Sequence, residues 1–153
     1  MIVTFCGHSD FVGNPQWEER VLSALETHVG GAPVDFYLGG YGGFDRFAEA
    51  CCRRYRELHP GARLILVTPY LTSSDSHGSN ASEYDEIIYP GLERVPPRYA
   101  IVHRNRWMVE RADLLIAYVT HRWGGAFGTL QRAKRVEIPV VNLALEGKSA
   151  DFS

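Results

Sequence analysis

The sequence lacks the features that mark several large classes of protein. Its formal net charge is only -2, and it has no basic run, which argues against nucleic acid as a partner. No apolar stretch approaches the roughly 20 residues that cross a bilayer. The first ten residues also lack the basic and long apolar regions of a secretory signal. We therefore expect a cytoplasmic protein that does not associate with a membrane.

Cysteine is also scarce, with three residues in the chain. Cys6 lies in an apolar strand pattern, and Cys51 and Cys52 are neighbours, which places them poorly for an ordinary disulfide. We expect reduced thiols, as in compartments that keep cysteine reduced. Neither CxxC nor HxxxH spacing occurs, so no metal site is predicted. The GxGxxG and Walker patterns are absent as well, and no cofactor is expected.

What the sequence does contain is a regular alternation of two kinds of segment, in a chain of 153 residues with 45% hydrophobic residues. That length suffices for one domain with its own core. Short apolar runs predict strands, and segments with a period of 3.6 residues predict helices. The expected strands are 2–6, 34–38, 63–68, 113–119 and 138–143, and the expected helices are 16–29, 44–58, 98–112 and 127–136.

This alternation predicts an α/β fold of the Rossmann-like, doubly wound kind. Its mainly parallel five-stranded sheet would carry helices on both faces. We expect a single domain over residues 1–145 and a frayed tail over residues 146–153. Residues 69–86 show no regular period, and such long loops are usually functional or mobile. Whether this loop closes as a lid stays open.

Four loops follow directly on expected strands. Because parallel strands end at one edge of the sheet, these loops meet where doubly wound folds bind ligands. They are 7-GHSD-10, 39-GGYGG-43, 69-PYLTSS-74 and 120-THRWGGAFGT-129. The first and third supply Gly7, His8, Ser9 and Tyr70 as candidate ligand-binding residues.

The second loop places four glycines within five residues, immediately before a helix. Glycine leaves the backbone bare, and the free N–H groups of a helix start favour an anion such as phosphate. We interpret Gly39, Gly40, Gly42 and Gly43 as a phosphate-binding loop. The alternative is a tight turn that needs glycine for packing alone. Asp45, which follows, would either cap the helix or accept hydrogen bonds from a ribose or base.

The fourth loop is a second glycine-rich segment before a helix. Gly124, Gly125 and Gly128 are candidates for a phosphate contact, and Thr129 would either cap the helix or touch the phosphate. His121 joins His8 on the same edge, and imidazole titrates near neutral pH. Trp123 and Tyr41 would either stack on a base or cover the end of the sheet.

The helix before the fourth strand carries two arginines that face different ways. Arg104 and Arg106 are two positions apart, so they cannot share one side of the helix. One of them is expected to point to the ligand edge, since arginine suits two-pronged contact with phosphate. The alternative is a solvated arginine, with Arg106 paired to Glu110 on the surface.

Taken together, these segments resemble the SLOG superfamily, the Rossmann-like group that includes the Smf/DprA proteins and the Lonely-guy phosphoribohydrolases. The resemblance covers nearly the whole chain and is closest to small single-domain bacterial members. It rests on IVTFCGHSDF, YLGGYGGFDRFAEACC and HRNRWMVERADLLIAYVTHRWGGAFGTLQRAKRVEIPVVNL. It implies a Rossmann-like fold and a nucleotide or nucleotide-derived, ADP-ribose-like ligand.

The resemblance also bears on catalysis, because Lonely-guy enzymes cleave a nucleoside monophosphate to base and ribose phosphate. Arg106 resembles their arginine, and residues 124–129 resemble their PGGxGTxxE loop with one extra residue. Where the family has glutamate, this chain offers Gln131 or Arg132, so the carboxylate expected to assist cleavage is absent.

Three functions follow from these observations. The preferred one is a nucleotide-binding sensor or ligand module without strong turnover. The alternative is an N-glycosidic hydrolase that uses a non-standard carboxylate, with Asp45 as the first choice and Glu49 and Glu110 next. The second alternative is a nucleic-acid binder related to DNA processing. The expected partner is a small-molecule nucleotide, and a homodimer is compatible with the sequence.

Overall fold

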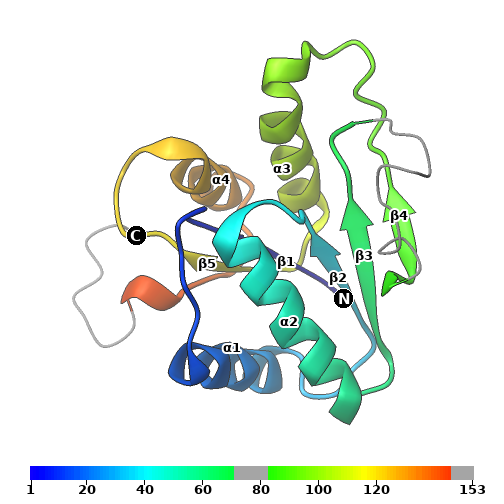
Figure 1. Cartoon of the computed structure of the whole chain (residues 1–153), viewed down its shortest axis with the longest axis vertical. Coiled ribbons are helices and arrows are strands. Elements are labelled where there is room, and N and C mark those ends of the chain that lie inside the picture. Colours follow the sequence, from blue (N-terminus) through cyan, green and yellow to red (C-terminus); the bar gives the residue numbers. More distant parts are fainter. Residues whose placement is uncertain (71–82, 146–153) are drawn as a thin grey trace.

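Six parallel strands form the centre of the computed structural model, which describes residues 1–70 and 83–145 (Figure 1). Along the sheet the order is β4-β3-β2-β1-β5-β6. The strands are β1 (Ile2–Gly7), β2 (Val34–Leu38), β3 (Ala62–Val67), β4 (Glu86–Ile88), β5 (Leu114–Tyr118) and β6 (Val140–Asn142). The Rossmann-like, doubly wound α/β fold predicted from the sequence is thereby confirmed.

The predicted number of strands, five, was wrong by one. The additional strand, β4, pairs with β3 through Ile65, Leu66 and Val67. It has only three residues, and Glu86 and Ile87 are exposed. A strand this short at a sheet edge shows no apolar pattern of its own, so its pairing depends on tertiary contact.

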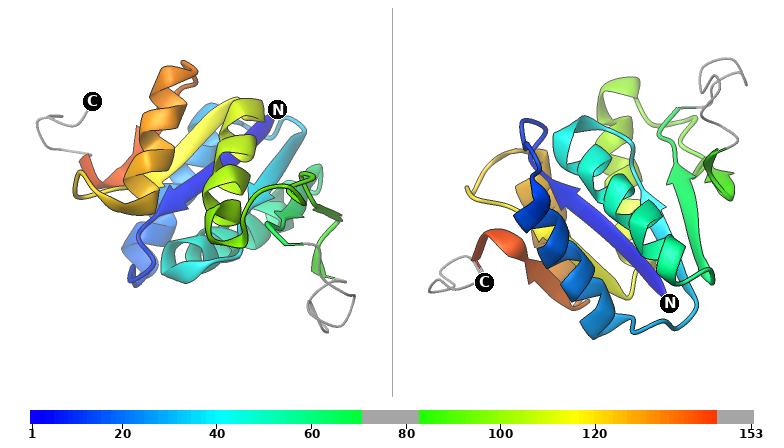
Figure 2. Two further views of the ribbon diagram at one scale, coloured as in Figure 1. Left: turned by 90° about the horizontal axis from the view of Figure 1, so that it is seen from above. Right: turned by 60° about the horizontal axis from the view of Figure 1, so that its bottom comes forward.

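Helices cover both faces of this sheet, as the two views in Figure 2 show. On one face α1 (Pro15–His28) packs against α2 (Gly42–Leu58), and on the other α3 (Ala100–Arg111) packs against α4 (Gly124–Arg135). Short 3-10 helices occupy Pro97–Tyr99 and Leu143–Leu145. The start of α1 is fixed locally, because Asn14 accepts a hydrogen bond from the Trp17 amide and Pro15 occupies the first turn.

Two helices, α2 and α4, begin two or more residues earlier than the sequence predicted. The expected starts were residues 44 and 127, but α2 begins at Gly42 and α4 at Gly124. Both glycines have φ of 89°, a conformation that residues with a side chain rarely adopt. Glycine therefore allows a sharp entry into each helix, although its low helix propensity argued for a later start.

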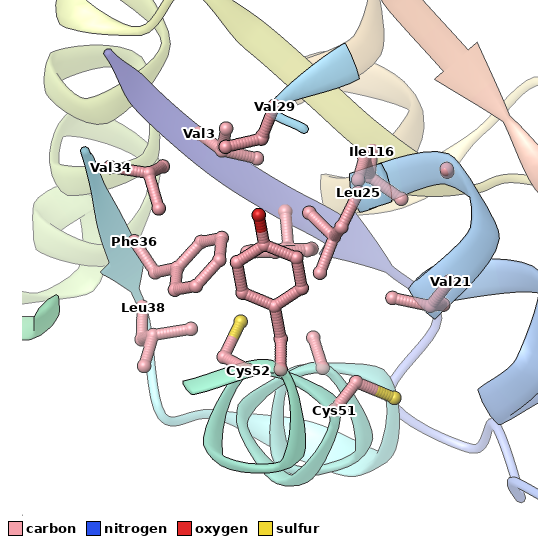
Figure 3. Packing of buried hydrophobic residues seen from close by; sticks show 14 of the residues in the cluster. Val3, Val21, Leu25, Val29, Val34, Phe36, Leu38, Cys51, Cys52 and Ile116 are labelled. Carbon is pink, nitrogen blue, oxygen red and sulfur yellow. The ribbon is translucent and has the colours of Figure 1, made fainter. Parts of the chain in front are cut away.

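The main core lies between the sheet and the α1–α2 layer (Figure 3). Val3 and Phe36 from the strands meet Leu25 of α1 and the buried pair Cys51 and Cys52 of α2. These two cysteines and Cys6 are buried free thiols. Their burial gives them a packing role in the core.

The strand order reverses beside β1, which is the feature that positions a site. From β1 the chain proceeds outward through β2, β3 and β4, then α3 carries it back to β5 on the other side of β1. Gly7 at the end of β1 is in register with Tyr118 at the end of β5. The loops that leave these two strands diverge to opposite faces, and this divergence opens a crevice at the carboxyl edge.

Some expectations fall outside the described structure. Most of the 69–86 loop, considered above as a lid, and the tail of residues 146–153 lie beyond the described residues. Within residues 1–70 and 83–145, no helix combines the length and apolar character needed to cross a membrane.

Candidate functional site

A hollow of about 450 Å³ lies at the reversal of strand order, and we call it the switch-point hollow. One wall is the end of β1 with its following loop, and the other walls are the starts of α2 and α4 and the side of α3. Of the residues proposed from the sequence, it brings together Gly7, His8, Ser9, Asp45, His121, Gly124, Gly125 and Thr129. They come from the end of β1 and the loop after it, the first turn of α2, and the loop and first turns that open α4.

The first turn of α4 is an exposed part of this hollow. No side chain caps the helix start, and Gly124 and Gly125 are exposed. A Cβ placed on Gly125 or Gly128 would meet no other atom within 4 Å. Packing within the described chain therefore does not require glycine at these two positions, and space remains for a ligand to approach the backbone.

Thr129 has a local partner. Its hydroxyl donates to the Gly125 carbonyl at 3.0 Å, and its side chain is buried. The helix therefore uses Thr129 internally, one turn after the open glycines. This bond gives the buried hydroxyl a partner, although a bond of this kind to the i−4 carbonyl does not strengthen a helix.

The start of α2 is closed, although its sequence resembles that of α4. The Gly43 N–H donates to the Ser9 carbonyl at 2.7 Å, and the Phe44 N–H donates to the His8 carbonyl at 3.3 Å. A Cβ on Gly43 would lie 2.2 Å from the Phe11 carbonyl oxygen. Glycine at positions 42 and 43 leaves room for the 8–11 segment, so packing explains both residues. The Gly43 amide is already bonded to Ser9 and does not contribute to the expected phosphate cradle.

Gly7, Gly39 and Gly40 also have local reasons to lack a side chain. A Cβ on Gly7 would lie 2.3 Å from the Phe44 ring. At Gly39 it would lie 2.8 Å from Asp45 Oδ2, and Gly40 has φ of 69°. Of the two glycine-rich loops, the one that opens α4 is therefore the one with exposed, unobstructed backbone.

Asp45 faces the switch-point hollow from the first turn of α2. Its Oδ2 accepts a hydrogen bond from the Tyr41 N–H at 3.1 Å, which closes the 41–45 turn. Burial raises the pKa of Asp45 to about 6, while the Tyr41 N–H and the charge of Arg104 act in the opposite direction. Asp45 is thus an acid whose protonation changes close to neutral pH.

Arg104 borders the same hollow and is only 1% exposed. Its Nη1 donates to the Gly39 carbonyl at 2.9 Å and to the Val67 carbonyl at 2.8 Å, and its Nε donates to Asn105 at 2.8 Å. Burial lowers its pKa, and the charge of Asp45 counteracts this shift. Arg104 thereby ties the ends of β2 and β3 to α3.

Sequence reasoning favoured Arg106 over Arg104 for the ligand edge, and the structure places them on different sides of α3. Arg106 is exposed and lines a second hollow, described below. A signal for Arg104 was present, because it lies four residues from both Ala100 and Met108, which are buried in the same helix. An arginine on the buried face of a helix is an unusual residue that needs partners.

Three aromatic rings form a stack along the rim. The His8 and His121 ring centroids are 4.0 Å apart, and those of His121 and Trp123 are 3.8 Å apart. Nε2 of His8 accepts the Thr120 N–H at 2.9 Å, so the proton of the neutral ring lies on Nδ1. Burial, followed by the charge of His121, lowers the pKa of His8, while Asp10 opposes the shift. Trp123 ends the stack and is 68% exposed.

The remaining sequence-based candidates lie away from the switch-point hollow. Glu49 accepts a hydrogen bond from Tyr84 at 2.6 Å and pairs with Arg53 at 3.1 Å. The Tyr70 hydroxyl donates to the Pro97 carbonyl at 3.3 Å. Glu49 thus joins α2 to the segment before β4, and Tyr70 joins the segment after β3 to the 3-10 helix Pro97–Tyr99.

A second hollow of about 340 Å³ lies between α3 and α4, and we call it the α3–α4 hollow. Arg106, Gly128 and Arg132 line it together with Val102. Glu110 pairs with Arg132 at 2.5 Å and, among the described residues, makes no ion pair with Arg106. The surface pairing of Arg106 with Glu110 considered from the sequence is therefore replaced by a contact between helices.

Comparison with known proteins places the fold. No protein-family model matches the chain, and no curated protein is significantly similar to it. DNA processing protein A from Helicobacter pylori, whose structure is described for its single-stranded DNA binding mode, aligns with a TM-score of 0.61 and 15% identity, over 92% of this chain and 63% of that one. DNA processing protein A from Streptococcus pneumoniae aligns with a TM-score of 0.63 and 16% identity, over 98% of this chain and 53% of that one. The structural-genomics target TM1055 aligns with a TM-score of 0.60 and 16% identity, over 98% of this chain and 78% of that one.

These similarities are similarities of fold, because the identities are low. The chain spans less than two thirds of the length of either DNA processing protein A. The sequence-based argument against nucleic acid gains no support, since one of these proteins binds single-stranded DNA. The comparisons therefore show a Rossmann-like fold shared with these proteins, and membership of the SLOG superfamily stays an expectation from the sequence.

Proposed function

We propose that this chain binds a phosphorylated nucleotide in the switch-point hollow, with the phosphate on the first turn of α4. The observation that carries the proposal is the open start of that helix. Its glycines have free space where a Cβ would be, and the helix has no side-chain cap. The N–H groups and the dipole at such a start attract an anion.

The size and position of the hollow support this proposal. Its volume of about 450 Å³ lies within the range of small-molecule sites. It also lies at the reversal of strand order, where doubly wound sheets bind ligands. Both properties are independent of the glycine pattern.

The rim offers a surface for the base. The stack of His8, His121 and Trp123 ends in an indole that is 68% exposed, on which the base of a ligand would stack. Stacking of a base on an aromatic side chain contributes about 1 to 3 kcal/mol. A nucleotide with its phosphate on α4 would therefore find its base partner in the loop that immediately precedes the helix.

Asp45 and Arg104 provide the polar floor of the hollow. The Asp45 carboxyl group, as an acid or as a carboxylate, would hydrogen-bond the hydroxyl groups of a ribose. Arg104 keeps the end of β2 in place through the Gly39 carbonyl, so its role is to position the wall. Binding without strong turnover also agrees with Gln131 or Arg132 at the position where the Lonely-guy enzymes have glutamate.

Calorimetry with AMP, ADP-ribose and a single-stranded oligothymidylate tests the proposal. Gly125→Val introduces a side chain into the open space above α4 and should weaken binding by about tenfold or more. Gly61→Val is the matched control, because a Cβ at Gly61 also meets no atom within 4 Å but lies outside the hollow. Absence of binding by all three probes at millimolar concentration, or unchanged binding by Gly125→Val, would refute the proposal.

The environment of Asp45 favours a second function, cleavage of an N-glycosidic bond. Of the three acids considered from the sequence, Asp45 alone lines the switch-point hollow, and its pKa of about 6 suits proton transfer near neutral pH. Chromatography for free base after incubation with AMP or NAD would detect the reaction. Base release that disappears in Asp45→Asn would support this function, and release no faster than the blank would exclude it.

A further inference from the structure

The two hollows described above are joined through the first turn of α4. Asn105, Gly124, Gly125 and Thr129 line both of them. The α3–α4 hollow lies between the two helices that cover one face of the sheet, side by side in the left view of Figure 2. A phosphate on the exposed glycine backbone would therefore lie at the border of the second hollow as well.

The charges around the α3–α4 hollow are mainly positive. Arg106 is exposed, and among residues 1–70 and 83–145 no hydrogen bond or ion pair engages its guanidinium group. Arg132 belongs to α4, and one of its terminal amino groups donates a hydrogen bond to Glu110. Its Nε is buried and has no hydrogen-bond partner in the described structure. Two arginines from facing helices thus retain donor capacity beside one hollow.

We propose that the α3–α4 hollow binds a second phosphate of the same ligand, beyond the phosphate that lies on α4. This inference rests on the proposed nucleotide binding and specifies the ligand as one with at least two phosphates. Arginine is suited to this task, because its fork of donors matches the oxygens of a phosphate. Val102, which is 50% exposed, gives the hollow an apolar wall beside these charges.

Glu110 sets the strength of this subsite. Its carboxylate pairs with Arg132 and so competes with an anionic ligand for the same guanidinium group. Replacement of Glu110 by glutamine would remove that competition and one nearby negative charge. The two kinds of substitution therefore have opposite expected effects: loss of Arg106 weakens binding of the second phosphate, and loss of the Glu110 charge strengthens it.

Calorimetry on the full chain with three probes tests the inference. AMP carries one phosphate, ADP carries two adjacent ones, and the 5′-phosphorylated dinucleotide pApA carries two that are separated by a nucleoside. We expect ADP or pApA to bind about tenfold more tightly than AMP. Which of them gains more tells whether the second phosphate is adjacent to the first or one nucleoside away.

Single substitutions then show which side chains cause the tighter binding of ADP or pApA. Arg106→Gln should abolish the advantage over AMP and leave AMP affinity within about twofold, while Glu110→Gln should increase the advantage. Arg135→Gln is the matched control, an exposed arginine at the end of α4 that lines neither hollow, and should change nothing. A missing advantage, its persistence in Arg106→Gln or an equal loss in Arg135→Gln would overturn the inference while AMP binding stands. Failure of AMP to bind would refute the proposed function instead.

Discussion

Exchange of single glycines for alanine should affect stability in opposite directions at the two helix starts. At Gly43 a Cβ would lie 2.2 Å from the Phe11 carbonyl oxygen and 2.8 Å from that of Ser9. Relief of this contact requires the 8–11 segment to move by about an ångström, since overpacked sites respond by backbone shifts. Gly125 has no such neighbour within 4 Å, and its φ is outside the range that disfavours side chains.

The structure sets the size of both effects. Overpacking costs about 1 to 3 kcal/mol. Displacement of the 8–11 segment also weakens the bond from the Gly43 N–H to the Ser9 carbonyl, for about 1 kcal/mol more. We therefore expect Gly43→Ala to lower the free energy of unfolding by about 2 to 4 kcal/mol. Gly125→Ala should leave it unchanged or raise it by up to about 1 kcal/mol, because alanine is the better helix former.

Thermal unfolding followed by circular dichroism measures the difference. For a domain of this size each kcal/mol corresponds to roughly 2 to 4 °C in Tm. Gly43→Ala should therefore melt about 5 to 15 °C below the wild type, and Gly125→Ala at or slightly above it. Equal Tm values for Gly43→Ala and the wild type would show that the 8–11 segment does not press on α2, and a large loss in Gly125→Ala would show that the start of α4 is not open.

Two further predictions concern charged groups of the site. Burial raises the pKa of Asp45 from 3.8 to about 6. Between these two pH values the folded state retains a proton that the unfolded chain has released. Asp45 therefore makes the free energy of unfolding fall as the pH rises from about 4 to about 6. Urea denaturation should show that the stability advantage of Asp45→Asn over the wild type grows by about 2 to 3 kcal/mol between roughly pH 4 and pH 7; a constant difference would contradict the shift. In the same assay Arg104→Gln should lower the free energy of unfolding by about 2 to 4 kcal/mol, because it removes the hydrogen-bond donor to the Gly39 and Val67 carbonyls. Replacement of the exposed Arg106 by glutamine should change it by no more than about 0.5 kcal/mol. Equal losses in the two variants would refute the structural role of Arg104.

Local pattern was sufficient for most of the framework. Apolar runs predicted the strands around Val3, Phe36 and Leu115, since a strand covered on both faces must be apolar throughout. Helical periodicity predicted all four α-helices, with boundary differences of up to three residues. The same alternation predicted that the glycine loops and both histidines of the rim meet at one edge. These properties depend on neighbours in the chain and on burial alone.

The phase of a helix against its sheet was harder to predict. Arg104 and Arg106 have the same chemistry and nearly the same surroundings in sequence, yet one is buried and the other exposed. Their difference depends on how α3 is rotated against β2 and β3, because Arg104 donates hydrogen bonds to the carbonyls of Gly39, just after β2, and Val67, at the end of β3. The edge strand β4 was also hard to predict, because three residues are too few to show a strand pattern and the strand is defined by its pairing with β3.

The sequence by itself determined that two glycine-rich loops lead into two helices. Only the tertiary structure decided which helix start is available to a ligand. At α2 the carbonyls of His8 and Ser9, which come from a distant part of the chain, occupy the first amides. At α4 the glycines border open space. A free amide attracts an anion, and whether it is free depends on which distant segment packs against it, a fact that no local pattern contains.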